Sequence, residues 1–172
     1  MYDAAIDAGA GLLAQYGLFV LLVAFTLEGA LVGKLVPTRA LFVAAVFAFG
    51  SDTVGIASIV LVAVVGATLG QIALFVLVRR TDVTLESLPG TGSSAADPTS
   101  TGRIDRWFDR WGISAVALSN AVPLARGSLT VPAAMTEIDP VRFSASSMIG
   151  SSVYAVGLVG VATGLDALVG LF

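Results

Sequence analysis

Four charged side chains stand inside the apolar part of this 172-residue sequence, at positions where they could bind a charged group. Glu28, Lys34 and Arg39 follow a long uncharged run, and Arg126 stands between two further uncharged runs. An ionised side chain inside a bilayer costs several kcal/mol unless it is paired or hydrated, so such residues are candidates for function. The alternative is that they belong to ordinary polar loops between helices.

Glycine and proline surround these charges in two segments, which we name the first break (residues 28–39) and the second break (residues 120–132). Both residue types interrupt helices, and Asn120 adds a polar side chain at the start of the second break. Non-helical backbone at membrane depth is tolerated only where protein or a water-filled cavity surrounds it. The interrupting residues are Gly29, Gly33, Pro37, Pro123, Gly127 and Pro132.

The composition indicates a membrane protein and excludes several kinds of catalytic and metal-binding chemistry. Hydrophobic residues make up 56% of the chain and charged residues 12%, about half the charge of a typical soluble domain. The absence of Cys and His excludes disulfides, thiolate nucleophiles, Cys/His zinc sites and histidine acid–base catalysis. We therefore expect no enzyme, cofactor or metal, although a site of Asp and Glu alone stays open. No basic stripe suited to nucleic acid is present.

The lengths of the uncharged runs predict how the chain crosses a membrane. About 20 apolar residues are needed to span the bilayer core, and the runs 53–78 and 143–165 satisfy this. The runs 40–51, 111–125 and 127–136 are shorter and suit re-entrant segments, whereas 8–27 either spans the membrane or turns back. A short–short–long pattern thus occurs twice, which is typical of an internal repeat of interrupted helices.

We therefore predict an all-α membrane protein with a single membrane domain over residues 1–172. It has two inverted repeats (8–80 and 111–165), each a re-entrant helical hairpin followed by a transmembrane helix. Small residues are expected to let the helices pack closely. These are Gly66, Gly70, Gly150 and Gly157.

A polar segment connects the two repeats. Residues 81–102 read as a flexible linker because they are rich in Gly, Pro, Ser and Thr, and residues 103–110 predict an amphipathic helix at the membrane interface. A short helix capping the protein is the alternative for 103–110. Five of the nine basic residues fall within 79–110, so this segment is expected in the cytoplasm of a multi-pass cell-membrane protein.

The order and spacing of these residues resemble the DedA family of membrane proteins, also called the SNARE-associated Golgi or VTT-domain family. The second half keeps a Pro-x-x-Arg element followed by an Ala, a Phe, an Ile-Gly pair and an aromatic residue, and the first half keeps a Glu…Pro element, a Gly-Ala-x-x-Gly element and an Arg. The matching residues are Pro123, Arg126, Ala133, Phe143, Ile149, Gly150, Tyr154, Glu28, Pro37, Gly66, Ala67, Gly70 and Arg79.

Three charged positions depart from the family's pattern, so the chain resembles a divergent member. Asn120 replaces an Arg, Arg39 replaces an acid, and Gln71 replaces an Asp. Glu28 and Arg126 remain.

The resemblance implies a transporter that moves polyprenyl-phosphate carriers or phospholipids between leaflets, coupled in some members to the proton gradient. Arg126 would bind the lipid phosphate, because arginine presents a forked and permanently charged donor. Glu28 would serve as its counter-charge or carry a proton, and Lys34 and Arg39, with Asn120 nearby, would complete the transport site. Assembly into a homo-oligomer stays open.

Two other functions remain compatible with the sequence. One is a secondary transporter of a small anionic solute that uses the same two breaks. The other is a membrane assembly subunit that transports nothing.

Overall fold

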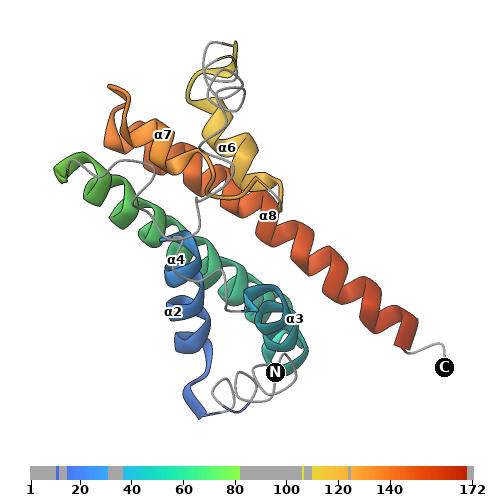
Figure 1. Cartoon of the computed structure of the whole chain (residues 1–172). Helices are drawn as coiled ribbons and strands as arrows, with labels where there is room; N and C mark the ends of the chain where they lie inside the picture. The colour runs from blue at the N-terminus through green and yellow to red at the C-terminus, as the bar shows by residue number, and fades with distance from the viewer. Residues whose placement is uncertain are drawn as a thin grey trace.

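The chain is all-helical in the part that its structure, a computed structural model, describes: residues 11, 15–30, 37–81, 106, 110–123 and 125–169. These residues form six helices and no strand (Figure 1). The helices are α2 (Leu18–Gly29), α3 (Thr38–Phe49), α4 (Thr53–Arg80), α6 (Ser114–Ala121), α7 (Thr130–Ala134) and α8 (Pro140–Val169). The predicted helical class is confirmed.

Some predicted features lie outside the described residues. They include Gly33 and Lys34 of the first break and residues 82–102 of the linker. Of the predicted interfacial helix 103–110, only Arg106 and Arg110 are described, and both are helical.

Two long helices, α4 and α8, form the centre of the molecule and run in opposite directions (Figure 1). Near the end of α4, Phe75 stacks on Phe143 near the start of α8, with 4.4 Å between ring centroids. Earlier in α4, Gln71 accepts a hydrogen bond from Ser147, which lies further along α8. With 28 and 30 residues, the helices are about 42 and 45 Å long, which exceeds the roughly 30 Å bilayer core.

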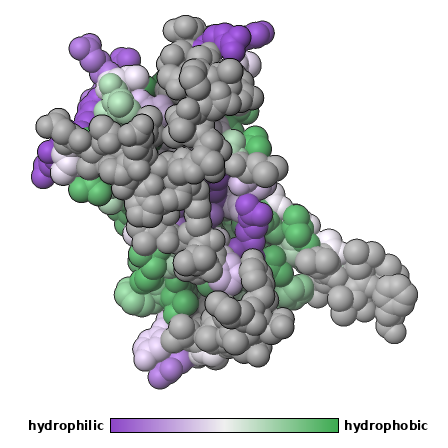
Figure 2. Space-filling view, in the orientation of Figure 1, coloured by the Kyte–Doolittle hydropathy of each residue, from purple (hydrophilic) through white to green (hydrophobic). Residues whose placement is uncertain are grey.

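Both long helices are apolar on the faces that they turn outward. Leu61, Leu69 and Leu77 on α4 are each at least half exposed, and so are Ile149 and Val153 on α8. Residues 53–80 and 140–164 are long and apolar enough to cross a membrane. In Figure 2, hydrophobic residues are visible on both sides of the described surface, and hydrophilic residues lie at the upper left, where α4 ends and α8 begins, as well as at the top, near the middle and at the lower end. The exposed apolar faces of the two helices are unfavourable in water and suit contact with lipid.

The first two helices are too short to cross a bilayer alone. The helices α2 and α3 have 12 residues each, or about 18 Å. Gly17, just before α2, adopts a positive φ of 59°, so the uncharged run 8–27 is not one straight helix. The interruption follows from glycine, because other residues rarely adopt this conformation.

Each half of the chain packs a short helix along a long one in the same direction. In the first half, Gly66 faces Leu22 and Gly70 faces Thr26, so α2 runs parallel to α4. In the second half, α6 runs parallel to α8. There Ser146 donates to the Ile113 carbonyl (2.7 Å) and accepts from the Ala117 amide (3.1 Å), and Gly150, one turn later on α8, faces Ala117 and Asn120, further along α6.

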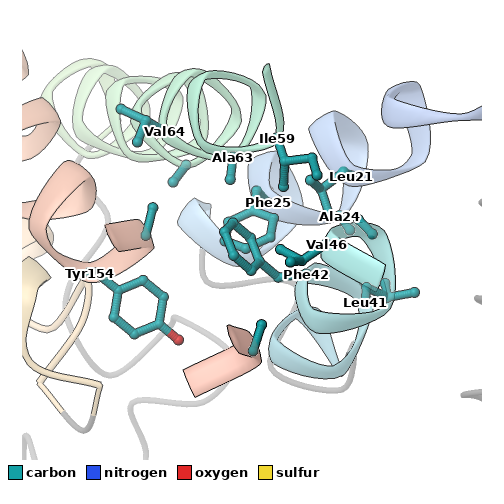
Figure 3. Packing of buried hydrophobic residues seen from close by; sticks show 14 residues of the cluster. Leu21, Ala24, Phe25, Leu41, Phe42, Val46, Ile59, Ala63, Val64 and Tyr154 are labelled. Carbon is teal, nitrogen blue, oxygen red and sulfur yellow. The ribbon is translucent and has the colours of Figure 1, made fainter. Parts of the chain in front are cut away.

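Buried apolar residues fill the spaces between these helices in two clusters. The larger cluster joins α2, α3 and α4 to the middle of α8, and in it Phe25 meets Phe42 edge-on with 6.0 Å between centroids (Figure 3). The smaller cluster joins the end of α4 to α6, α7 and the start of α8. At that end Arg79 donates to the carbonyls of Thr136 (2.7 Å) and Ile138 (2.6 Å). Arg79 therefore ties the end of α4 to the turn before α8.

Glycines allow the closest approaches between helices. A Cβ at Gly70 would collide with the main chain of α2, and a Cβ at Gly150 would collide with the main chain of α6. Gly157 differs: it is exposed, and a Cβ there would meet no atom within 4 Å. Among the described residues, Gly157 therefore packs against no other helix, because its face of α8 points outward.

Two substitutions on α8 test this packing. Gly150→Ala is expected to lower the free energy of unfolding by about 1–3 kcal/mol, because the new methyl group overpacks the α6–α8 contact. Gly157→Ala adds the same methyl group in open space and should be neutral or stabilising by up to about 1 kcal/mol, because alanine favours helix. Thermal unfolding of the purified protein in detergent measures both. Equal melting temperatures for the two variants would contradict the close contact.

Candidate functional site

The structure brings the charged residues of the two breaks together. Glu28 lies at the end of α2, and Arg126 lies in the turn between α6 and α7. The Arg126 Nε and Glu28 Oε1 atoms are 4.0 Å apart, and the side chains are 7% and 21% exposed. A largely buried pair of opposite charges thus joins the two halves of the chain.

The second break holds Arg126 in place through its own backbone. Gly127 adopts a positive φ of 73°, which a glycine accepts without strain, and its N–H donates to the Asn120 Oδ1 atom (3.1 Å). This bond links the last turn of α6 to the residue after Arg126 and so holds the two ends of this loop together. The guanidinium is thereby directed toward the first half of the chain.

Aromatic rings cover the Arg126 guanidinium. Its Cζ atom lies 4.0 Å from the centroid of the Tyr154 ring and 5.5 Å from that of Phe25. Such cation–π contacts stabilise a desolvated guanidinium by about 2 kcal/mol. Two of its nitrogens, Nε and Nη1, nevertheless have no hydrogen-bond partner in the described structure, and neither does Glu28 Oε2. The pair therefore leaves polar atoms of both charges unsatisfied.

A second arginine reaches the site through Tyr154. Arg39, in the first turn of α3, donates from Nε to the Tyr154 hydroxyl (3.1 Å) and from Nη2 to the Pro123 carbonyl (3.2 Å). Tyr154 stands at the edge of the larger apolar cluster (Figure 3), and it contacts both arginines. Arg39 is exposed, whereas the side chain of Arg126 is only 7% exposed. Among the described residues of the site, two cations thus face one carboxylate.

The charged groups lie midway along both long helices. Tyr154 is close to the midpoint of α8, and Gly29, next to Glu28, packs against Ala67 at the midpoint of α4. The ends of the helices are about 20 Å away in either direction. The site is therefore as far from the helix ends as the fold allows.

A neutral network lies beside the charged pair. The amides of Gln71 and Asn120 exchange two hydrogen bonds, of 3.0 and 2.9 Å, and the Ser147 hydroxyl also donates to Gln71. All three side chains are buried. Asn120, predicted as a transport residue, is thus engaged on both ends of its amide and supports the second break.

The hydrogen-bonded pair of Gln71 and Asn120 was not predicted from the sequence, although both residues stood out as departures from the family pattern. The two positions stand in different halves and are each polar within an apolar run. The available signal was that both depart from the family pattern where it carries opposite charges. The departures meet in space, so one neutral pair stands where the pattern would place an acid and an arginine.

The remaining predicted residues fall in or beside the site. Pro37 precedes α3, and its carbonyl accepts from the Leu41 amide (3.0 Å). Pro123 offers its carbonyl to Arg39. Pro132 does not interrupt the chain as predicted: it lies within the first turn of α7, where proline is tolerated because the missing N–H has no helical partner. The described residues contain no group of three or more metal-ligating side chains.

Removal of the Asn120 amide tests the neutral network. Asn120→Ala leaves the Gln71 Nε2 group and the Gly127 N–H without partners, so we expect a loss of about 2–4 kcal/mol in unfolding free energy. Ser119→Ala is the matched control, since Ser119 is equally buried but bonds only to the Val116 carbonyl of its own helix. Its loss should stay near 1 kcal/mol. Chemical denaturation in detergent compares the two, and equal losses would mean that the network does not support the break.

Comparison with known proteins gives the family. The VTT domain matches residues 36–163, which include Arg39, Gln71, Asn120, Arg126 and Tyr154. Undecaprenyl phosphate transporter A of Staphylococcus aureus (strain NCTC 8325 / PS 47) is 32% identical over 57 residues, which are 33% of this chain and 28% of that protein. The match thus spans less than a third of the relative's length.

No solved structure matches the chain. The VTT match covers most of the chain, with all of α4 and most of α8, in agreement with the resemblance drawn from the sequence. The chain belongs to the VTT-domain family of membrane proteins.

Proposed function

We propose that this protein transports a lipid with a phosphate headgroup between the leaflets of the cell membrane. The observation that carries the proposal is the buried Arg126 guanidinium, whose Nε and Nη1 atoms lack hydrogen-bond partners in the described structure. A buried charge without adequate partners costs several kcal/mol. A phosphate group would satisfy two N–H groups at once, since arginine binds phosphate in a bidentate manner.

The charge balance of the site supports an anion as the ligand. Arg126 and Arg39 carry two positive charges against one on Glu28, so a bound anion reduces the net charge. Glu28 would hold Arg126 when the site is empty and compete with the phosphate for it, which promotes release. The relative named undecaprenyl phosphate transporter A is consistent with a polyprenyl phosphate as the lipid.

The architecture suits movement between leaflets. In our proposal, α2–α3 and the second break with its short helices form two re-entrant hairpins, and α4 and α8 span the membrane. The parallel packing of α2 with α4 and of α6 with α8, combined with antiparallel long helices, favours an inverted repeat. The two breaks would then enter from opposite sides and meet near the bilayer midplane, where a crossing headgroup needs a polar stop.

Transport of a small soluble anion is the main competitor, because the same two arginines would bind it. An enzyme is disfavoured by the names of the family and of the relative. A lipid substrate is preferred because outward faces of both long helices are apolar, which lets an acyl or prenyl chain stay in the bilayer while the headgroup enters the site.

Translocation in liposomes tests the assigned roles. Arg126→Ala should lower the rate of polyprenyl-phosphate translocation at least about tenfold, because it removes the charged hydrogen bonds to phosphate. Arg126→Lys should retain part of the rate, since it keeps the charge without the fork. Glu28→Gln should slow turnover by strengthening anion binding and delaying release.

Arg142→Ala is the control, because Arg142 is exposed at the start of α8 and lies outside the site. Its rate should equal that of the wild type. Equal rates in the Arg126, Glu28 and Arg142 variants would contradict the proposal. Uptake of inorganic phosphate without lipid translocation would instead support the soluble-anion transporter.

The proposed orientation can be measured with single cysteines, since the chain contains none. Thr81→Cys and Thr136→Cys stand at the end where α4 meets the turn before α8, and Ser51→Cys stands before the start of α4. With residues 79–110 in the cytoplasm, a membrane-impermeant maleimide should label only Ser51→Cys in intact cells. The other two should require permeabilisation. Labelling of Thr81→Cys in intact cells would reverse the orientation.

A further inference from the structure

Two buried hydroxyls on the long helices have no hydrogen-bond partner in the described structure. Thr68 on α4 is 7% exposed and Ser151 on α8 is fully buried, and neither hydroxyl oxygen is bonded. A buried hydroxyl is normally paired, because its desolvation is otherwise uncompensated. Both residues therefore need an explanation that the packing does not supply.

Other hydroxyls in the same helices behave differently. Four of them donate to the carbonyl of the residue four positions earlier in their own helix, which is the ordinary solution for Ser and Thr in a helix, and Ser146 and Ser147 bond to other segments. Bonds of this kind are made by Ser58, Ser144, Ser152 and Thr163. These four hydroxyls are in exposed surroundings, where water is an alternative partner. The buried hydroxyls of Thr68 and Ser151 do not make the corresponding bond to their own helix. Their oxygens are thus available to something between the helices.

The register of the long helices places Thr68 and Ser151 at one level. Gln71 on α4 bonds to Ser147 on α8. Thr68 lies about one turn before Gln71, and Ser151 lies one turn after Ser147, so in the antiparallel pair both lie on the same side of this contact. Tyr154 follows Ser151 by one further turn and carries Arg126 on its ring. The hydroxyls therefore lie between the neutral network and the Arg126 site.

The unsatisfied atoms at this level favour a ligand rich in acceptor oxygens. Arg126 supplies two N–H groups without partners, and the two hydroxyls can each donate once. A phosphate monoester presents three acceptor oxygens on its headgroup, which is the complement of such a donor set. Glu28 Oε2 also lacks a partner, but it is a negatively charged acceptor and cannot donate to a phosphate oxygen. Glu28 therefore suits the role of counter-charge to Arg126 and not that of a phosphate ligand.

We infer that the hydroxyls of Thr68 and Ser151 bind the oxygens of the phosphate headgroup together with Arg126. This rests on the proposed function and extends it, since it assigns binding residues to both long helices. A phosphate fits this donor set better than a carboxylate does, because its three oxygens and its larger negative charge can match Arg126 and two separate hydroxyls at once. The substrate class is therefore a lipid with a terminal phosphate.

Thermal stabilisation of the purified protein measures this binding with three probes: farnesyl phosphate, inorganic phosphate and farnesol. The wild type should be stabilised by farnesyl phosphate and not by farnesol. Thr68→Val and Ser151→Ala should each weaken the apparent affinity for farnesyl phosphate about tenfold, the loss expected for one hydrogen bond to a charged group. Without ligand, both variants should melt at or above the wild-type temperature, because each removes an unpaired buried hydroxyl.

Thr163→Val and Ser152→Ala are matched controls, because their hydroxyls bond within their own helix. Both should bind farnesyl phosphate within about twofold of the wild type. Unchanged affinity in Thr68→Val and Ser151→Ala, with stabilisation of the wild type intact, would overturn the inference and leave the proposed function standing. A lower melting temperature of these variants without ligand would also overturn it, since the hydroxyls would then be structural.

The remaining outcomes separate the two proposals. If farnesyl phosphate does not stabilise the wild type, the proposed function fails, and the hydroxyl contacts fail with it. If inorganic phosphate binds as tightly as farnesyl phosphate and is weakened by the same variants, the hydroxyl contacts are supported. The ligand is then a soluble phosphate, and the proposed transport of a lipid is wrong.

Discussion

Several elements of this fold contact or support one buried guanidinium, that of Arg126. Arg126 is held at the middle of two long helices, where its side chain is only 7% exposed and its charge must be balanced by the protein. The balance comes from Glu28 on α2, the ring of Tyr154 on α8 and the turn that Gly127 and Asn120 close. Each support belongs to a different segment, so the two halves must assemble before the charge is accommodated.

The neutral network next to this charge separates support from function. Every polar side-chain atom of Gln71, Asn120 and Ser147 has at least one hydrogen-bond partner, and a well-paired network in a low-dielectric interior is rigid. The charged group beside it is incompletely satisfied in the described structure. A rigid frame beside an unsatisfied cation is the arrangement expected of a binding site, because preorganisation lowers the cost of binding.

The sequence predicted the parts of this fold that depend on length and polarity. The uncharged runs 53–78 and 143–165 became α4 and α8 with nearly the same limits, because a long apolar run has one stable solution in a bilayer. Glu28 and Arg126 stood out because charges are rare in the chain. The proximity of Glu28 to Arg126 could not be predicted from either segment alone.

Contacts between distant segments could not be read from one sequence. The pairing of Gln71 with Asn120 and the link from Arg39 to Tyr154 depend on the register between helices, which small residues set by close approach. The outward direction of Gly157 also depends on this register. Pro132 was misplaced for a local reason, since proline both interrupts helices and begins them.

The apolar outward faces have a consequence for how this chain tolerates change. Helices in lipid gain little from hydrophobic burial against each other, so their arrangement rests on close contacts and a few hydrogen bonds. Positions such as Leu61, Leu69 and Leu77 can exchange one apolar side chain for another at little cost, because lipid adapts to any of them. Recognisable similarity between such proteins is then concentrated in a small number of interior positions, while the rest of the sequence drifts.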